Sequence, residues 1–440
     1  MLRTIYWLCV VFAGFYAAGA QAVLPIQHWQ AASGAQVYFV ENHDLPMIDL
    51  SIDFPAGSGY DSKEKAGLAA LTQHALKLGA AGLSEDEIAK RVADVGAMLG
   101  GRFDFDRAGL SLRTLSSARE RDQALDVMQR MLQLPEFPAD AVEREKARIV
   151  SGIKEEDTKP ESISDRAFYQ MIYGAHPYAL RSDGEVDTVA ALTRDDLLDF
   201  YRRHYLARNA VVAIMGDISR QEAERIVEGL TAALPKSDTV AVLPAVTPLA
   251  AGEVRKIPHP ASQSHILLGA PGVKRSDPDY YALYVGNYIL GGGGFASRLT
   301  EEVREKRGYA YSVYSYFMPL QETGPFQIGL QTKKEQAEQA LKVVHETLHD
   351  FLTKGPTAQE LEKAKQNIVN GFALRIDSNK KIQEYLSAIG FYKLPLNYLD
   401  TFIPNIEKVS LADIRAAFKR HLDPDRMVTV IVGAVEEQNK

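Results

Sequence analysis

Residues 193–216 read "TRDDLLDFYRRHYLARNAVVAIMG", and this stretch decides the fold because the chain repeats its pattern. Residues 410–433 read "SLADIRAAFKRHLDPDRMVTVIVG", 217 positions further along the chain. Each copy starts with a helix N-cap residue, Thr193 or Ser410, and has an aspartate three positions later, as a capping box requires. Each copy therefore predicts a capped amphipathic helix, a short turn and a buried strand of β-branched residues.

Shorter matches at nearly the same offset extend the duplication over most of the chain. The matching pairs are "DQALDVMQ" (122–129) with "EQALKVVH" (338–345), "AVEREKARIVSGI" (141–153) with "ELEKAKQNIVNGF" (360–372), and "IDLSIDFPAGS" (48–58) with "HILLGAPGVKR" (265–275). We predict an α+β fold of two homologous halves, each a sheet covered by helices. The halves span residues 23–235 and 253–440, and the proline-containing segment 236–252 is expected to be an extended linker.

The N-terminus has the features of a secretory signal peptide. Arg3 precedes the apolar run "YWLCVVFAGFYAAGA", and Ala20-Gln21-Ala22 forms an A-x-A cleavage site. We predict residues 1–22 to be removed and the mature chain to be periplasmic, with a retained membrane anchor as the alternative. The only cysteine, Cys9, lies in this segment, so no disulfide and no cysteine-ligated metal is expected afterwards.

Composition excludes some partners. The chain has 440 residues, of which 46% are hydrophobic and 24% charged, and this length predicts more than one domain. The net charge of −7, without a basic tract, argues against a nucleic-acid partner. After signal cleavage, no membrane association is expected.

A helix in the first half has the spacing of a zinc site but lacks its chemistry. In "GLAALTQHALKLG" (67–79), Ala70, Gln73 and His74 lie at i, i+3 and i+4 on one helical face. His, Glu and His at these positions would form the inverted zinc motif H-x-x-E-H. Ala70 cannot ligate a metal and the neutral amide of Gln73 cannot act as a general base, so only His74 remains.

Two further segments, "HPY" (176–178) and "GGGGFASRLTEEVREKRGYAYSVYSYF" (291–317), accompany this degenerate motif in a duplicated chain. On these features, the chain resembles the pitrilysin/insulinase-type metallopeptidases. The likeness is closest to bacterial members with two half-repeats and to the mitochondrial processing peptidase subunits. The resemblance implies a third ligand, a glutamate, within "ARIVSGI", where this chain has Gly152. The duplicate half has Gly371 at the equivalent position. We therefore expect no metal in this chain.

The resemblance also implies a substrate-binding pair. Some subunits of the family carry an arginine and a tyrosine seven positions apart after a glycine-rich loop, and here these are Arg304 and Tyr311. By resemblance, the pair holds the substrate backbone near the scissile bond and stabilises the developing charge. The alternative interpretation is purely structural: the segment would be a solvent-exposed charged helix followed by a strand in which tyrosines are common.

The local pattern around this pair predicts its secondary structure. We expect a helix with Thr300 as N-cap and Gly308 at its end, followed by an aromatic strand in which Tyr311 shares a face with Tyr309 and Val313.

Gly291, Gly292, Gly293 and Gly294 precede the pair. No Lys-Ser/Thr follows them, so a phosphate-binding P-loop is excluded. A run of four glycines predicts a flexible segment. The resemblance implies a surface over which an unfolded peptide passes.

The stretch "HETLH" (345–349) matches a different zinc motif, H-E-x-x-H. An apolar stripe is expected on this helix, with His345 and His349 at its edge; the stripe residues are Ala337, Leu341, Val344, Leu348 and Phe351. Leu352 stands where the metzincin extension needs glycine, and only Glu360 or Glu362 could be a third ligand. The duplicate helix reads "QRMLQ" (129–133), which favours a structural helix. His204 and His421, at the repeated helix ends, are expected to interact favourably with the helix dipole.

These observations predict the non-metal-bearing subunit of a heterodimeric zinc metallopeptidase, inactive alone. It would bind peptide or unfolded protein for hydrolysis by a homologous partner subunit that holds the zinc. The alternatives are a zinc protease that uses His345 and His349, and a non-enzymatic peptide-binding scaffold.

Overall fold

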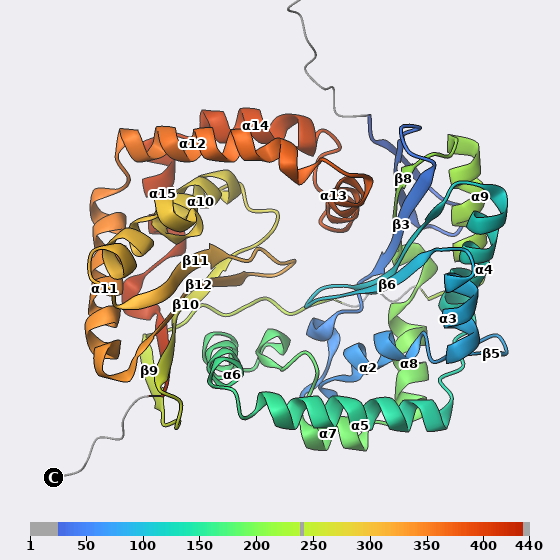
Figure 1. Cartoon of the computed structure of the whole chain (residues 1–440), viewed down its shortest axis with the longest axis horizontal. Coiled ribbons are helices and arrows are strands. Elements are labelled where there is room, and N and C mark those ends of the chain that lie inside the picture. The colour runs from blue at the N-terminus through green and yellow to red at the C-terminus, as the bar shows by residue number, and fades with distance from the viewer. Residues whose placement is uncertain (1–24, 238–241, 434–440) are drawn as a thin grey trace, which may run out of the picture.

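The computed structural model describes residues 25–237 and 242–433, so the predicted signal segment lies outside the described residues. Two β-sheets face each other across the molecule, each with helices on its outer side (Figure 1). The described residues contain no helix that is long and apolar enough to cross a membrane. The predicted α+β architecture is confirmed.

The first sheet has six strands in the order β1-β2-β8-β3-β7-β6. Its strands are β1 (Gln27–Gln30), β2 (Gln36–Glu41), β3 (Met47–Phe54), β6 (Met98–Phe103), β7 (Ala108–Leu115) and β8 (Val211–Gly216). A small two-stranded sheet comprises β4 (Gly79–Ala80) and β5 (Leu83–Ser84). The helices are α2 (Leu68–Ala75), α3 (Glu85–Ala93), α4 (Ala118–Gln133), α5 (Ala139–Glu156), α6 (Pro160–Tyr173), α7 (Val186–Ala191), α8 (Arg194–His204) and α9 (Arg220–Thr231).

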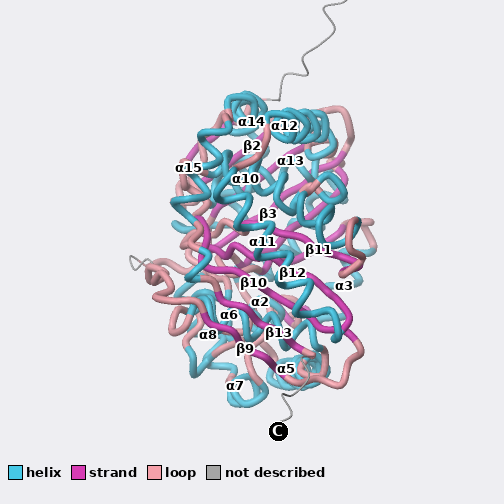
Figure 2. Tube along the Cα trace, turned by 90° about the vertical axis from the view of Figure 1, so that its left-hand side faces the viewer, coloured by secondary structure: helices cyan, strands magenta, loops and turns pink. Residues whose placement is uncertain are grey.

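The second sheet has five strands in the order β11-β12-β10-β13-β9. Its strands are β9 (Glu253–Ile257), β10 (Gln263–Val273), β11 (Ala310–Phe317), β12 (Gly324–Lys333) and β13 (Val428–Val432). The helices are α10 (Tyr280–Asn287), α11 (Ala337–Lys354), α12 (Ala358–Phe372), α13 (Asn379–Phe391), α14 (Tyr398–Lys408) and α15 (Leu411–His421). In Figure 2, α10, α11 and α15 lie over the face of this half that is turned toward the viewer.

The duplication extends to topology. β2 pairs with β8 in parallel and β9 pairs with β13 in parallel, while the other pairs in both sheets are antiparallel. Both predicted capping boxes are present: the Thr193 and Ser410 hydroxyls accept hydrogen bonds from the backbone N–H groups of Asp196 and Asp413. The repeated sequence thus builds the same helix-turn-strand unit twice.

The predicted role of His204 is wrong. Its ring is buried, stacks on Phe200 at 4.2 Å, and places Nδ1 3.2 Å from the carbonyl oxygen of Pro55. Burial lowers the pKa of His204 to about 4, so the ring is neutral at pH 7 and adds no charge to the helix end. His421 makes the duplicate contact, with Nδ1 3.0 Å from the Gly272 carbonyl oxygen.

Each half donates one helix to the sheet of the other half. α6 packs on β10 and β13 of the second sheet, and its duplicate α13 packs on β8 and β3 of the first sheet (Figure 1). Phe168 of α6 is fully buried in a cluster with Leu267 and Val430. On the other side, Leu386 of α13 shares a core cluster with Val211. The two halves therefore share their hydrophobic cores.

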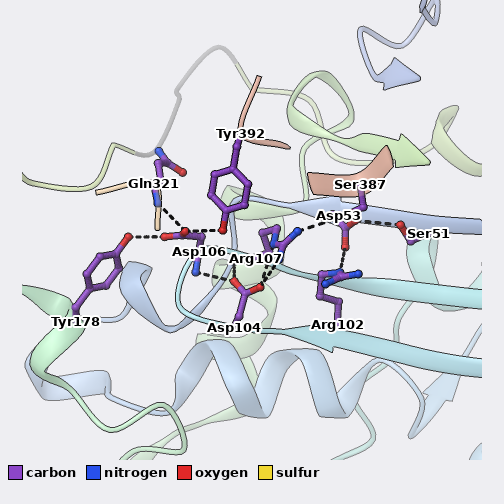
Figure 3. A network of polar contacts seen from close by, with 10 residues as sticks. All are labelled: Ser51, Asp53, Arg102, Asp104, Asp106, Arg107, Tyr178, Gln321, Ser387 and Tyr392. Carbon is purple, nitrogen blue, oxygen red and sulfur yellow. Dashed lines mark hydrogen bonds and ion pairs between the residues drawn. The ribbon is translucent and has the colours of Figure 1, made fainter. Parts of the chain in front are cut away.

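A buried polar network also joins the halves (Figure 3). Asp106, fully buried in the β6–β7 loop, accepts hydrogen bonds from the Tyr178 hydroxyl, from the Tyr392 hydroxyl at 2.9 Å and from the Gln321 backbone N–H at 2.8 Å. Burial raises the pKa of Asp106, although the three donors act against that shift. Because Gln321 and Tyr392 come from the second half, Asp106 fixes one half against the other.

Candidate functional site

The degenerate zinc helix α2 is held in place by a neighbouring carboxylate. Gly67 precedes it with φ +93° and no side-chain cap, and Asp61 accepts the N–H groups of Gly67 and Ala69 at 2.8 and 2.9 Å. These two bonds satisfy free donors of the first turn. Ala70 is fully buried, whereas the side chain of His74 is 30% exposed.

Helix α5 places two charged side chains next to His74, the carboxylate of Glu145 and the guanidinium of Arg148. His74 Nδ1 lies 3.1 Å from Glu145 Oε1, and Arg148 Nη2 lies 2.5 Å from the same oxygen and 3.5 Å from His74 Nδ1. One nitrogen cannot donate to Glu145 and accept from Arg148 together, so the shorter contact assigns the Nδ1 proton to Glu145. Hydrogen bonds from Arg148 and His74 hold the pKa of Glu145 well below its usual range.

Gly152 lies two helical turns after Glu145 on the same face of α5. A Cβ added at Gly152 would meet no heavy atom within 4 Å, so a side chain has room there. The residues present nevertheless do not fit zinc. A methyl group replaces one ligand, a ligand side chain is missing at Gly152, and the Arg148 guanidinium lies beside the one histidine.

Gln73 has a structural position. Its Nε2 donates to the Gly109 carbonyl oxygen at 3.4 Å, and a Cβ added at Gly101 would lie 1.9 Å from Nε2. The amide thus packs directly on β6 and links it to α2. Gln73 and His74 border a pocket of about 580 Å³, which is lined by both charged residues, such as Lys77 and Glu85, and apolar residues, such as Leu99.

Three members of the glycine run, Gly291, Gly292 and Gly293, approach neighbouring atoms closely, which a run of four glycines alone does not predict. Gly291 and Gly292 end a π-helical turn, Tyr288–Gly292. A Cβ added at Gly291 would lie 2.4 Å from Ser315 Oγ, and Cβ atoms at Gly292 and Gly293 would also lie within 3.0 Å of neighbouring atoms. A side chain is excluded at Gly291 because it lies directly against β11, and at Gly292 and Gly293 because they lie against Asn287 and Tyr288.

Hydrogen bonds fix the same contact. Asn287 Nδ2 donates to the Ser315 carbonyl oxygen at 2.9 Å, and Ser315 Oγ donates to Asn287 Oδ1 at 2.7 Å. Gly294 differs from the other three glycines: it has φ +57° and open space around its Cα. Glycine is favoured at position 294 because of this positive φ, not because a side chain would collide with a neighbour.

Arg304 and Tyr311 are brought together, along with an aromatic residue that the sequence analysis did not single out. The Arg304 guanidinium carbon lies 5.4 Å from the ring centroid of Tyr311 and 4.7 Å from that of Phe295. Tyr311 and Phe295 are 81% and 73% exposed, so both rings present faces to solvent. The sequence feature that could have indicated Phe295 is its position directly after four glycines.

Two local predictions around the pair are wrong. Residues 298 and 299 are already helical, so Thr300 lies inside the helix and is buried; its hydroxyl accepts from Ser297 Oγ at 3.0 Å. A β-bulge between Ala310 and Ser312 turns Tyr311 outward while Val313 stays buried, so the two share no face. Gly308 ends the helix as predicted, with φ +64° and its N–H bonded to the Arg304 carbonyl oxygen at 2.9 Å.

One pocket of about 330 Å³ lies between the glycine run and β11. It is lined by Arg304, Gly291, Gly292 and Gly294, together with residues 312–316 of β11. β11 is an edge strand of its sheet, so the backbone on its outer side pairs with no described strand. The Arg304 side chain is 34% exposed, and within the described part of the chain it forms one ion pair, with Glu305 at 3.3 Å. The pocket therefore places a guanidinium, which suits a peptide carbonyl, beside an edge strand whose Ser315 carbonyl oxygen already accepts from Asn287.

The HETLH helix, α11, is structural in its described surroundings. The five predicted stripe residues are buried, while His345 and His349 lie on the exposed side. In residues 25–237 and 242–433, the one set of three close metal-ligand side chains is Asp277, Asp279 and His421, so neither α11 histidine has the required neighbours. Glu360, considered as a third ligand, is bound by Arg298 at 2.6 Å.

Comparison with known proteins agrees with this architecture. Residues 37–181 match the insulinase family (peptidase family M16), and residues 191–368 match the peptidase M16 inactive domain. An uncharacterized zinc protease of Streptomyces coelicolor is 30% identical over 325 residues, covering 72% of this chain and 70% of that protein. A non-peptidase homologue of Helicobacter pylori, YmxG, is 27% identical over 405 residues, covering 90% of this chain and 91% of that protein.

A crystal structure of a peptidase M16 inactive domain from Pseudomonas fluorescens is also similar. It is 39% identical with a TM-score of 0.91, and the match covers 94% of this chain and 99% of that one. The chain belongs to the M16 (insulinase-type) peptidase family, as the resemblance predicted.

Proposed function

We propose that this chain is the non-catalytic subunit of a heterodimeric metallopeptidase, inactive alone. It binds an extended peptide beside β11 and presents it to a homologous partner chain that carries the complete zinc motif and hydrolyses it. The observation that carries the proposal is the contrast between the halves: the α2–α5 site does not fit zinc, while Arg304 lines a pocket along an edge strand. The "inactive" and "non-peptidase" names of similar proteins support the same conclusion.

The chemistry of the pair suits this role. An extended peptide can add to the free side of an edge strand through main-chain hydrogen bonds. The guanidinium of Arg304 and the phenol of Tyr311 supply N–H and O–H donors for a substrate carbonyl oxygen that gains negative charge during hydrolysis. Phe295 and Tyr311 flank the guanidinium and hold it through cation–π contacts.

The test is peptide cleavage by the chain reconstituted with its zinc-motif partner. Arg304→Ala should lower kcat by roughly a hundredfold to a thousandfold, the usual cost of one oxyanion donor. Arg304→Lys should not restore activity, because an ammonium lacks the planar fork of the guanidinium. Tyr311→Phe should lower kcat in the same direction, and loss of substrate positioning would also raise KM.

The matched control is Lys306→Ala. It removes a positive charge two residues from Arg304 on a side chain that is 52% exposed and paired with Glu301 and Glu302. Zinc content of the partner and the size of the complex should be unchanged in every variant. Normal cleavage rates for both Arg304→Ala and Tyr311→Phe would refute the role in trans and favour the peptide-binding scaffold.

We also propose that the protein acts in the periplasm. The proposal rests on the charged start, apolar run and A-x-A site of residues 1–22. N-terminal sequencing of the protein from the native cell should begin at Val23. An intact Met1 terminus in a membrane fraction would favour the retained anchor.

A further inference from the structure

A second pocket, of about 420 Å³, adjoins the Arg304 pocket and has its own charge pattern. The two pockets share the lining residues Gly292, Ser315 and Tyr316. The charged residues that line the second pocket are two arginines, Arg275 and Arg375, and no aspartate or glutamate of the described chain lines it. The remaining walls are largely aromatic, with Tyr280, Tyr284, Tyr288, Tyr316 and Phe317.

The two arginines are fixed by a stack of tyrosines. Tyr280 and Tyr284, one turn apart on α10, stack with their ring centroids 6.0 Å apart. The guanidinium carbon of Arg275 lies 4.8 Å from the Tyr280 ring, and that of Arg375 lies 5.6 Å from the Tyr284 ring. An arginine thus caps each end of the stack, and packing rather than an ion pair sets its position.

Neither arginine is neutralised by the described residues. Arg275 donates to the hydroxyls of Tyr280 and Tyr398, both at 3.3 Å, and neither it nor Arg375 lies within 4 Å of a carboxylate in residues 25–237 or 242–433. A guanidinium has five N–H donors, so Arg275 keeps donors free for a ligand. The acids nearest in sequence have other partners: Asp277 lies 3.6 Å from His421 Nε2, and Asp377 pairs with Lys381 at 2.9 Å.

We propose that this pocket, the Arg275/Arg375 pocket, binds a carboxylate of the peptide whose backbone lies beside β11. The proposal deepens the proposed function and rests on it. A planar carboxylate matches the guanidinium fork, and the tyrosine ring beside the half-buried Arg275 limits its contact with water and strengthens the bond. The carboxylate comes either from the peptide's C-terminus or from an aspartate or glutamate side chain, and the experiment below separates the two sources.

The experiment measures fluorescence anisotropy of labelled peptides with the purified mature chain in low salt. Three twelve-residue peptides of Ala, Ser, Leu and Phe are compared: one with a free C-terminal carboxylate, one with a C-terminal amide, and one with a C-terminal amide and an internal glutamate. At least one carboxylate-bearing peptide should bind roughly tenfold or more tightly than the neutral amide, as expected for hydrogen bonds to a charged group. Whichever of the two binds tighter identifies the source.

Arg375→Gln is the first variant, because Arg375 is exposed and its substitution should leave the fold intact. It should reduce the preference for the carboxylate about tenfold and leave binding of the neutral amide unchanged. Arg275→Gln should act in the same direction. The matched control is Arg202→Gln, since the Arg202 side chain is 66% exposed on the first half and lines none of these pockets.

The outcomes distinguish the two proposals. Binding of all three peptides with equal affinity would overturn the carboxylate site while leaving peptide binding intact. A carboxylate preference that survives both arginine variants would overturn the site in the same way. Absence of binding by every peptide would overturn the carboxylate site and the peptide-binding function together.

Discussion

Exchange of α6 and α13 between the halves predicts that the halves unfold together, and Phe168→Ala tests this. Phe168 belongs to the first half in sequence, yet its ring packs on the second sheet, where a Cβ added at Gly269 would lie 2.9 Å from it. The side chain is fully buried, so its truncation should cost about 3–5 kcal/mol of unfolding free energy. Because the lost contacts join the halves, the cost should appear in the stability of both.

Two probes of urea denaturation separate coupled from independent unfolding. In a protein prepared without residues 1–22, Trp29 is the only tryptophan, and it lies on β1 against Phe39 in the first half, so its fluorescence reports that half. Far-UV circular dichroism reports both halves. We expect the two curves to coincide for the wild type and to shift together to lower urea in Phe168→Ala.

The control is Phe295→Ala, which removes an equally large ring that is 73% exposed and should change stability by less than about 0.5 kcal/mol. A two-step dichroism curve for Phe168→Ala, in which the Trp29 transition keeps its wild-type midpoint, would refute the reasoning. The exchanged helices would then cover the sheets without coupling them.

Three further predictions concern metal, backbone and pH. Elemental analysis of the isolated chain should find no stoichiometric zinc. The double variant Ala70→His/Gln73→Glu should still not bind zinc tightly, because two histidines do not complete a three-ligand site. A content of about one zinc per chain that disappears in His345→Ala would instead support the HETLH site. Gly291→Ala should lower the unfolding free energy by about 1–3 kcal/mol, since its Cβ would collide with β11, and thermal melting measures this. The pKa of His204 is lowered to about 4 in the folded state from its ordinary value of 6.5, so the unfolded chain binds the extra proton and stability should fall by up to about 3 kcal/mol as the pH drops from 6.5 toward 4. Denaturation curves of His204→Asn, compared with wild type across that pH range, should lack this part of the slope even though the variant is less stable at pH 7.

Much of the fold could be predicted because the duplication made each half a check on the other. N-caps at Thr193 and Ser410, strands after them and the buried stripe of α11 all follow from local patterns of capping and periodicity. Which sheet a helix covers is not a local property, however. The sequence of α6 gives an apolar face but does not say that this face meets β10 of the other half, so the exchange of helices could be found only in the structure.

The candidate site was predictable in its residue types and less so in its geometry. The spacing of Arg304 and Tyr311 placed them at a helix-to-strand junction, which the structure has. The β-bulge that turns Tyr311 outward depends on pairing with β12 and leaves no clear mark on a single strand. The rigidity of Gly291 likewise depends on a distant neighbour, Ser315, whose approach the glycine run alone does not indicate.

The persistence of His74 without a zinc site has a structural explanation. Glu145 is 8% exposed, and a carboxylate buried to that extent is costly unless it is paired. The His74 N–H and the Arg148 guanidinium both bind it, so the three side chains form a satisfied cluster between α2 and α5 without any metal. Loss of His74 would leave Glu145 with fewer partners, which is reason enough to keep the histidine.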